Sequence, residues 1–80
     1  MSAVKTVEIY IPLLDEGTPT IRGTEAVNLG NNLYKVLPTP FYDPEDEIWQ
    51  FLPGTIVKCE KTKDYKGKDI LLAILEVKKL

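Results

Sequence analysis

The feature that most limits the fold is the regular interruption of the sequence by glycine and proline. Six prolines and five glycines are distributed over 80 residues. Between them, apolar β-branched residues alternate with more polar neighbours, most clearly at Val7, Ile9 and Ile11. Alternation with a period of two is typical of a strand with one buried face. The sequence therefore predicts an all-β protein made of short strands.

Strands are expected at about residues 4–13, 20–29, 33–37, 48–52, 55–61 and 69–79. Five or six short antiparallel strands joined by turns favour a small barrel, SH3-like or OB-like. A chain of this size forms one core, so residues 1–80 are expected to be a single β-barrel domain. One alternative stays open for residues 69–79, because Asp69 could cap a helix there. The preceding Lys- and Gly-rich turn favours a strand that returns antiparallel.

The second predicted strand does not alternate cleanly. Ile21, Gly23, Glu25, Val27 and Leu29 share one parity, which would place a carboxylate among apolar side chains. Because an extra residue shifts the side-chain register by one, we expect a bulge or a bend near Gly23.

The composition argues against several classes of function. The net charge is −2, which does not favour nucleic acid as a partner, and there is no histidine to act as a general base. The single cysteine, Cys59, alternates with Val57 on the predicted inward face, so we expect a buried structural thiol. We expect no enzyme and no cofactor. The N-terminus lacks the apolar run of a signal peptide, so a cytoplasmic protein without membrane association is expected.

A loop at about residues 38–46, together with the residue after it, combines two aromatic side chains with several carboxylates. Its candidate partner-binding residues are Phe41, Tyr42, Asp43, Glu45, Asp46 and Glu47. Aromatic side chains concentrate interface energy, and carboxylates attract a basic partner, so this loop is a candidate protein-docking surface. Three other interpretations remain: a solvated acidic loop, a Ca²⁺ or Mg²⁺ site, and aromatic side chains that cover the open end of the barrel.

A second candidate surface is the hairpin between the last two strands. Its candidate nucleic-acid-binding residues are Lys61, Lys63, Tyr65, Lys66 and Lys68. Basic and aromatic side chains together can bind single strands by charge and stacking. However, Asp64 and Asp69 dilute the positive charge, and lysines also protect exposed strand edges. Nucleic acid is therefore the less favoured partner. Trp49 and Phe51 share a parity and are expected to pack into the core.

Three blocks carry a resemblance to known sequences: the turn Leu13-Leu14-Asp15-Glu16-Gly17, Arg22 with Glu25-Ala26, and the segment from Asp46 to Glu60. The last block contains the pattern Trp-x-Phe-x-Pro-Gly-x-x-Val-x-Cys. With these blocks the chain resembles a group of small bacterial proteins of uncharacterised function. The group has an aromatic residue before the arginine and a proline after it, which this chain lacks. The resemblance implies a compact β-rich fold and a bacterial source, without a reaction or a ligand.

These observations lead to two hypotheses. The first is a non-enzymatic protein-interaction module, for example an immunity or accessory protein that covers a basic site of its partner. The second is a small barrel that binds single-stranded nucleic acid. The protein is expected to be a monomer or a homodimer, because Ile70, Leu72 and Ile74 make the second face of the last strand apolar.

Overall fold

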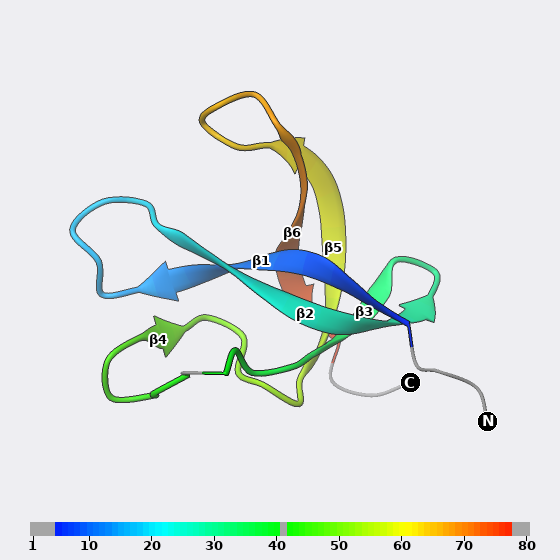
Figure 1. Cartoon of the computed structure of the whole chain (residues 1–80), viewed down its shortest axis with the longest axis horizontal. Helices are drawn as coiled ribbons and strands as arrows, with labels where there is room; N and C mark the ends of the chain where they lie inside the picture. The colour runs from blue at the N-terminus through cyan, green and yellow to red at the C-terminus, as the bar shows by residue number, and fades with distance from the viewer. Residues whose placement is uncertain (1–4, 41, 78–80) are drawn as a thin grey trace.

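The computed structural model describes residues 5–40 and 42–77, in which the regular structure consists of strands (Figure 1). The six strands are β1 (Thr6–Leu14), β2 (Ile21–Gly30), β3 (Leu33–Val36), β4 (Ile48–Trp49), β5 (Ile56–Lys63) and β6 (Asp69–Glu76). The prediction of an all-β protein is therefore confirmed. The last segment is a strand, so the helical alternative is wrong; residues 78 and 79 of that prediction lie outside the described residues.

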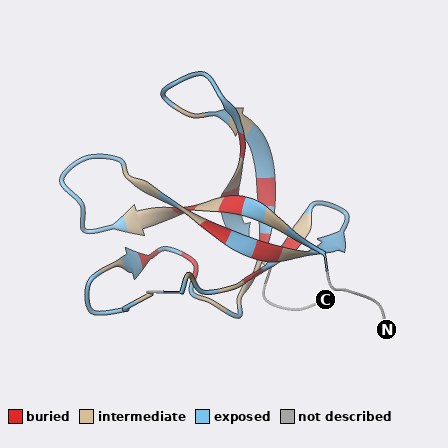
Figure 2. Ribbon diagram, in the orientation of Figure 1, coloured by how far each residue is buried: buried red, intermediate tan, exposed pale blue. Residues whose placement is uncertain are grey.

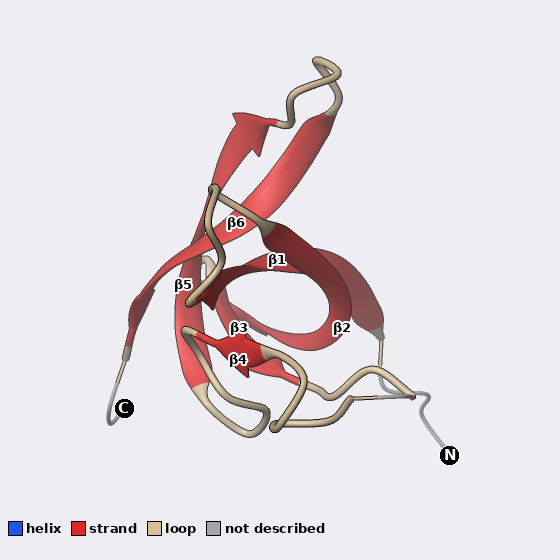
Figure 3. Cartoon of the chain, turned by 90° about the vertical axis from the view of Figure 1, so that its left-hand side faces the viewer, coloured by secondary structure: helices blue, strands red, loops and turns tan. Residues whose placement is uncertain are grey.

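Five of the strands form a ring (Figure 3). Antiparallel pairings join β1 to β2, β2 to β3, β3 to β5 and β5 to β6. The ring closes where Tyr10 of β1 pairs with Leu72 of β6, and this pairing is parallel, unlike the predicted antiparallel arrangement. The reason is geometric, since five strands of alternating direction cannot close without one parallel pair. The strands follow the ring in chain order, without the Greek-key crossing of an OB-fold.

The core lies inside this ring. It extends to β4, a strand that is not part of the ring and that pairs with β1 (Figure 2). Its buried members are Ile9, Ile11, Ala26, Tyr34, Val36, Trp49, Phe51, Val57, Cys59 and Ala73. The predicted inward positions of Trp49, Phe51 and Cys59 are confirmed. The one buried polar side chain among the described residues is Thr24, whose Oγ1 donates a hydrogen bond of 2.6 Å to the Leu37 carbonyl. The hydroxyl is therefore satisfied within the core.

Of the bulge or bend predicted near Gly23, the bulge is wrong. The ladder between β1 and β2 runs without a shift from Thr6 opposite Val27 to Pro12 opposite Ile21. Thr24 and Ala26 point inward instead, which leaves Glu25 on the outer face. The sequence argument failed because it assigned the larger apolar side chains to the core, whereas a hydrogen-bonded threonine and an alanine occupy those positions. Both strands curve together (Figure 3).

Register shifts occur at two other places. One lies between Asn28 and Gly30, beside the turn where Gly30, Asn31 and Asn32 all adopt positive φ, as residues that tolerate the left-handed region can. The other makes Ile74 an extra residue of β6, between the pairs Cys59–Ala73 and Lys58–Leu75. Leu75, which alternation places inward, is consequently 45% exposed. Ile70 belongs to the second face as predicted, but it is buried.

The described part of the chain contains no helix of the length and apolarity needed to cross a membrane.

Candidate functional site

The acidic loop is defined here as residues 42–47, which follow Phe41, a candidate residue outside the described residues. The loop is anchored to the core at both ends. At its start, the Tyr42 ring packs against Trp49, with the ring centroids 4.6 Å apart and the planes tilted by 59°. At its end, Glu47 accepts a hydrogen bond of 3.0 Å from Nε1 of Trp49. Trp49 is 2% exposed, so a buried side chain sets the position of the loop.

A single arginine completes this anchor. Arg22 of β2 donates from Nε to Glu47 Oε2 over 2.8 Å, and its terminal nitrogen also contacts the same oxygen. Charge-assisted hydrogen bonds of this kind are stronger than neutral ones. The loop is thereby joined to β2, although Arg22 and Glu47 are 25 residues apart in the sequence.

The middle of the acidic loop is a tight turn organised by Asp43. The Asp43 carbonyl accepts hydrogen bonds of 3.0 Å from the backbone N–H groups of Asp46 and Glu47. Its side chain accepts a further bond of 2.9 Å from the N–H of Glu45. Asp43, Glu45 and Asp46 are exposed. The loop therefore presents three carboxylates on a backbone that is held in place by hydrogen bonds.

The Glu47 interactions lower the pKa of its carboxyl group. The hydrogen bond from Arg22 is the main cause, and the bond from Trp49 adds to it. A lowered pKa in the folded state means that the ionised form contributes stability above the unfolded-state pKa of about 4.3, and that this contribution is lost as the pH falls through the folded-state value.

A pH series on Glu47→Gln tests this linkage. At pH 7 the variant is expected to have a lower free energy of unfolding than the natural protein, because the ionised acceptor is lost. The difference should shrink as the pH falls from about 4.3 through the lower folded-state pKa, below which Glu47 is protonated in both states. Urea denaturation from pH 2.5 to 7 measures it. A difference in unfolding free energy between the two proteins that does not change with pH would contradict the linkage.

Two hollows lie beside the acidic loop and share Gly23 and Thr39 in their walls. One is lined by Glu8, Gly23, Thr24, Glu25, Leu37, Pro38, Thr39 and Pro40. The other is lined by Arg22, Gly23, Thr39, Asp43, Asp46 and Glu47. Each hollow contains carboxylates, and Arg22, the basic side chain that lines the second hollow, is already engaged by Glu47.

The first hollow is acidic because two glutamates face each other across strands. Glu8 of β1 is directly opposite Glu25 of β2, an arrangement of like charges that is unfavourable in a sheet. Each is held by a hydroxyl donor: Tyr10 donates to Glu8 over 3.3 Å, and Thr6 donates to Glu25. The repulsion is therefore reduced by hydrogen bonds, while both negative charges remain on the surface.

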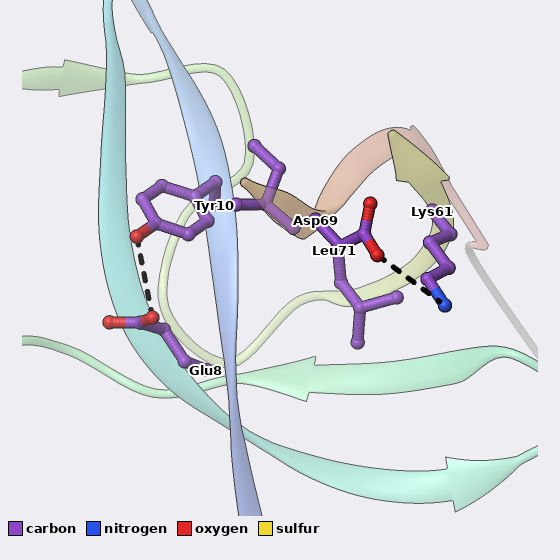
Figure 4. A pocket seen from close by; sticks show the side chains of 6 residues that line it. Glu8, Tyr10, Lys61, Asp69 and Leu71 are labelled. Carbon is purple, nitrogen blue, oxygen red and sulfur yellow. Dashed lines mark hydrogen bonds and ion pairs between the residues drawn. The ribbon is translucent and has the colours of Figure 1, made fainter. Parts of the chain in front are cut away.

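In the basic hairpin, the less favoured candidate surface, Asp69 reduces the positive charge as its sequence position suggested. Asp69 contacts both Lys61 at 4.0 Å and Lys63 at 2.7 Å. Figure 4 shows Lys61 and Asp69 in a hollow between the hairpin and β1, with Tyr10 and Glu8 on its other side. A carboxylate is thus shared between two of the candidate lysines.

At the tip of the hairpin, the backbone is folded around Asp64, which accepts bonds from the N–H groups of Lys66 and Lys68. Tyr65 is 91% exposed, and the Lys66 ammonium lies 5.7 Å from the centre of its ring. One stacking surface is therefore available to a ligand at the tip.

Neither a reactive thiol nor a metal site emerges from the described residues. Cys59 is 5% exposed, and burial raises the pKa of its thiol to about 11, so it is protonated near neutral pH. This agrees with the predicted structural role. In the described ranges, no group of three or more His, Cys, Asp or Glu side chains is placed to hold a metal ion.

Sequence reasoning missed the residues that border the acidic loop in space. Arg22, Gly23, Glu8 and Glu25 lie on β1 and β2, far from the loop in sequence. One signal was available: Arg22 is the only arginine of the chain, in a segment whose alternation was ambiguous. Its partner could not be identified without the register of β2.

No family model matches this chain, and neither the curated proteins nor the solved structures compared with it contain a match.

Proposed function

We propose that the protein is a non-enzymatic interaction module that binds a basic surface of a partner protein through its acidic loop. The observation that carries this proposal is the combination of three exposed carboxylates with a buried anchor. Asp43, Glu45 and Asp46 are exposed, while Tyr42 and Glu47 attach the loop to Trp49. A loop ordered before binding loses less conformational entropy on association.

The charge of the acidic loop is also available to a partner. Among residues 5–40 and 42–77, the ion pairs join Arg22 to Glu47, and Lys61 and Lys63 to Asp69. Within that part of the chain, the three exposed carboxylates of the loop face no basic side chain at ion-pair distance. Unneutralised charge of one sign accelerates association with an oppositely charged surface and disfavours other partners.

One form of this function is an immunity or accessory protein of the bacterial cytoplasm, whose acidic loop covers a basic site on its partner. A lone, buried cysteine fits a reducing compartment, because the fold uses no disulfide. In this form the module inhibits or escorts its partner by occupying the basic site, and it needs no chemistry of its own.

The alternative is binding of single-stranded nucleic acid through the hairpin tip. The exposed ring of Tyr65 favours it, since aromatic side chains stack on bases. The sharing of Asp69 between Lys61 and Lys63 weakens it, because phosphate binding depends on free positive charge. Titration of a fluorescent oligonucleotide at low salt distinguishes the two functions.

The test of the interaction module is charge reversal at two exposed loop positions, Glu45→Lys together with Asp46→Lys. A partner captured by the natural protein from a bacterial lysate is expected to bind the double variant at least about 10-fold more weakly, because several attractive contacts become repulsive. The matched control is Glu16→Lys with Glu60→Lys, which changes the net charge equally at exposed positions outside the loop. Equal loss in both double variants, or loss in neither, would reject the acidic loop as the docking surface.

A further inference from the structure

Close to the acidic loop, β2 pairs with a neighbouring strand on one side only. On one side it pairs with β1 from Val27 down to Ile21. On the other side its pairing with β3 extends only from Gly30 to Ala26. The last backbone bond on that side runs from the Leu37 N–H to the Glu25 carbonyl, over 3.0 Å. The chain then continues through Pro38 and Pro40, which have no N–H to donate.

The ladder geometry shows which backbone groups face this gap. In a strand, the N–H and C=O groups of successive residues point to opposite sides. The Thr20 carbonyl accepts a bond from Leu13 of β1, whereas the Glu25 carbonyl points away from β1 to Leu37. The odd-numbered residues Ile21 and Gly23 therefore direct their N–H and C=O groups away from β1. No strand among the described residues pairs with them on that side, so β2 has an open edge at Ile21–Gly23.

The two acidic hollows lie at this open edge. Gly23 and Thr39 line both of them. Because successive side chains of a strand point to opposite faces, a strand added at the edge would direct neighbouring side chains into different hollows. One hollow offers Glu8 and Glu25, and the other offers Asp43, Asp46 and Glu47.

Gly23 has no side chain on the face of the sheet that Glu8 and Tyr10 occupy. A Cβ at this position would lie 3.2 Å from both Glu8 Oε2 and the Tyr10 ring. Tyr10 is the cross-strand neighbour of Gly23, so its ring already covers the space beside the glycine. A larger residue would push Tyr10 and Glu8 out of place and alter the first hollow.

We propose that an extended basic segment of a partner protein binds by adding a strand to β2 at Ile21–Gly23, with two neighbouring Lys or Arg side chains in the two acidic hollows. The backbone bonds supply affinity, and the carboxylates of the two hollows select the basic side chains, as in other cases of strand addition. This inference rests on the proposed function and specifies how the partner is held.

The first test uses a defined probe, the capped peptide Ser-Val-Arg-Lys-Val-Ser, titrated into isotope-labelled protein and followed by NMR. The amide signals of Ile21 and Gly23 are expected to shift and their hydrogen exchange to slow. The same peptide with Glu-Glu in place of Arg-Lys is the control and should produce neither change. Binding that leaves both amides unchanged would overturn strand addition. If both amides exchange slowly without peptide, and more slowly at higher protein concentration, the edge pairs with a second copy of the chain. That result would overturn the proposal that a basic segment of a partner occupies the edge.

The second test removes one donor from the protein. Gly23→Pro lacks the N–H that faces the gap, and Gly23→Ala is its matched control, because both variants introduce a Cβ beside Glu8 and Tyr10. Affinity for the peptide is expected to be about 3- to 10-fold lower in the proline variant than in the alanine variant, the usual effect of one hydrogen bond. Equal affinities would contradict the proposed role of the Gly23 N–H.

The third test leaves the protein unchanged, so it does not depend on the folding of any variant. A strand bonds its neighbour through every second N–H only. Peptides N-methylated at either the Arg or the Lys should therefore differ: one position should weaken binding about 10-fold or more, and the other should have little effect. Equal effects at both positions would overturn strand addition.

The outcomes separate this inference from the proposed function. If Glu45→Lys with Asp46→Lys abolishes partner binding while the N-methylated peptides bind equally, the acidic loop is a docking surface but the partner does not add a strand. If the charge variants bind the partner normally and the unmodified peptide fails to bind, both proposals are rejected.

Discussion

Replacing Trp49 with alanine is expected to lower the free energy of unfolding by about 3–5 kcal/mol, the usual range for removing a large buried aromatic side chain. Trp49 is 2% exposed and is the largest fully buried side chain described in the protein. Its loss would also remove the packing partner of Tyr42 and the donor to Glu47. For a domain of this size, such a change can be most of the total stability.

The measurement is urea denaturation followed by circular dichroism, because the only tryptophan of the chain is the residue removed. Trp49→Phe is the informative companion. It retains an aromatic ring in the core but lacks the N–H that bonds Glu47, so a smaller loss is expected, about 1–3 kcal/mol. A Trp49→Ala variant that unfolds at the same urea concentration as the natural protein would show that β4 does not contribute to the core.

The second large effect is expected for Ile9→Ala, which should lower the free energy of unfolding by about 2–5 kcal/mol. Ile9 is 0% exposed and lies on β1, the strand that pairs with β2, β4 and β6. Removing its side chain leaves a cavity in the core beside β1. The measurement is again urea denaturation, with the slope compared between variants to check that the unfolded states are alike.

Ile74→Ala is the matched control for Ile9→Ala. The substitution is chemically identical, but Ile74 is the extra residue of the β6 bulge and is 40% exposed. A loss below about 1 kcal/mol is expected there, because much of the side chain is already in water. Similar losses at the two positions would contradict the assignment of the core to the interior of the ring.

These core substitutions also clarify how the acidic loop should be tested. Trp49 lies in the core and Glu47 in the acidic loop, and a hydrogen bond joins them, so changes at either position alter stability and loop geometry together. Asp43 organises the turn through its carbonyl and its side chain. Glu45 and Asp46 are exposed and are the positions at which charge can be changed with the least effect on the fold. A binding defect there reports on docking rather than on unfolding.

The bulge in β6 shows where alternation stops predicting burial. Val57 and Cys59 follow the period of two and are buried as predicted. In β6 the same rule holds for Leu71 and Ala73 and fails at Leu75, because one extra residue reverses the faces beyond it. A single insertion of this kind leaves no signal in the pattern of β6 itself, because its residues are apolar on both faces.

The same limitation applied to the candidate site. The acidic loop could be identified from its own residues, because turn-forming and charged side chains are local signals. The sequence could not show which carboxylates of the loop have an ion-pair partner, because the partner of Glu47 is an arginine from the distant strand β2. In the basic hairpin, the sequence shows Asp69 only as a nearby negative charge, whereas the structure pairs it with both Lys61 and Lys63. Ion pairs between distant segments depend on register, which local patterns do not contain.

Short strands follow from local sequence, because glycine and proline interrupt the chain and β-branched residues alternate between the interruptions. The inward position of Cys59 and the position of the acidic loop could also be predicted, since each depends on neighbouring residues alone. The parallel closure at Tyr10 and Leu72, the partner of Arg22 and the open edge of β2 became visible in the folded chain alone. These features depend on which strands meet and in which register, and that choice is made by packing over the whole core.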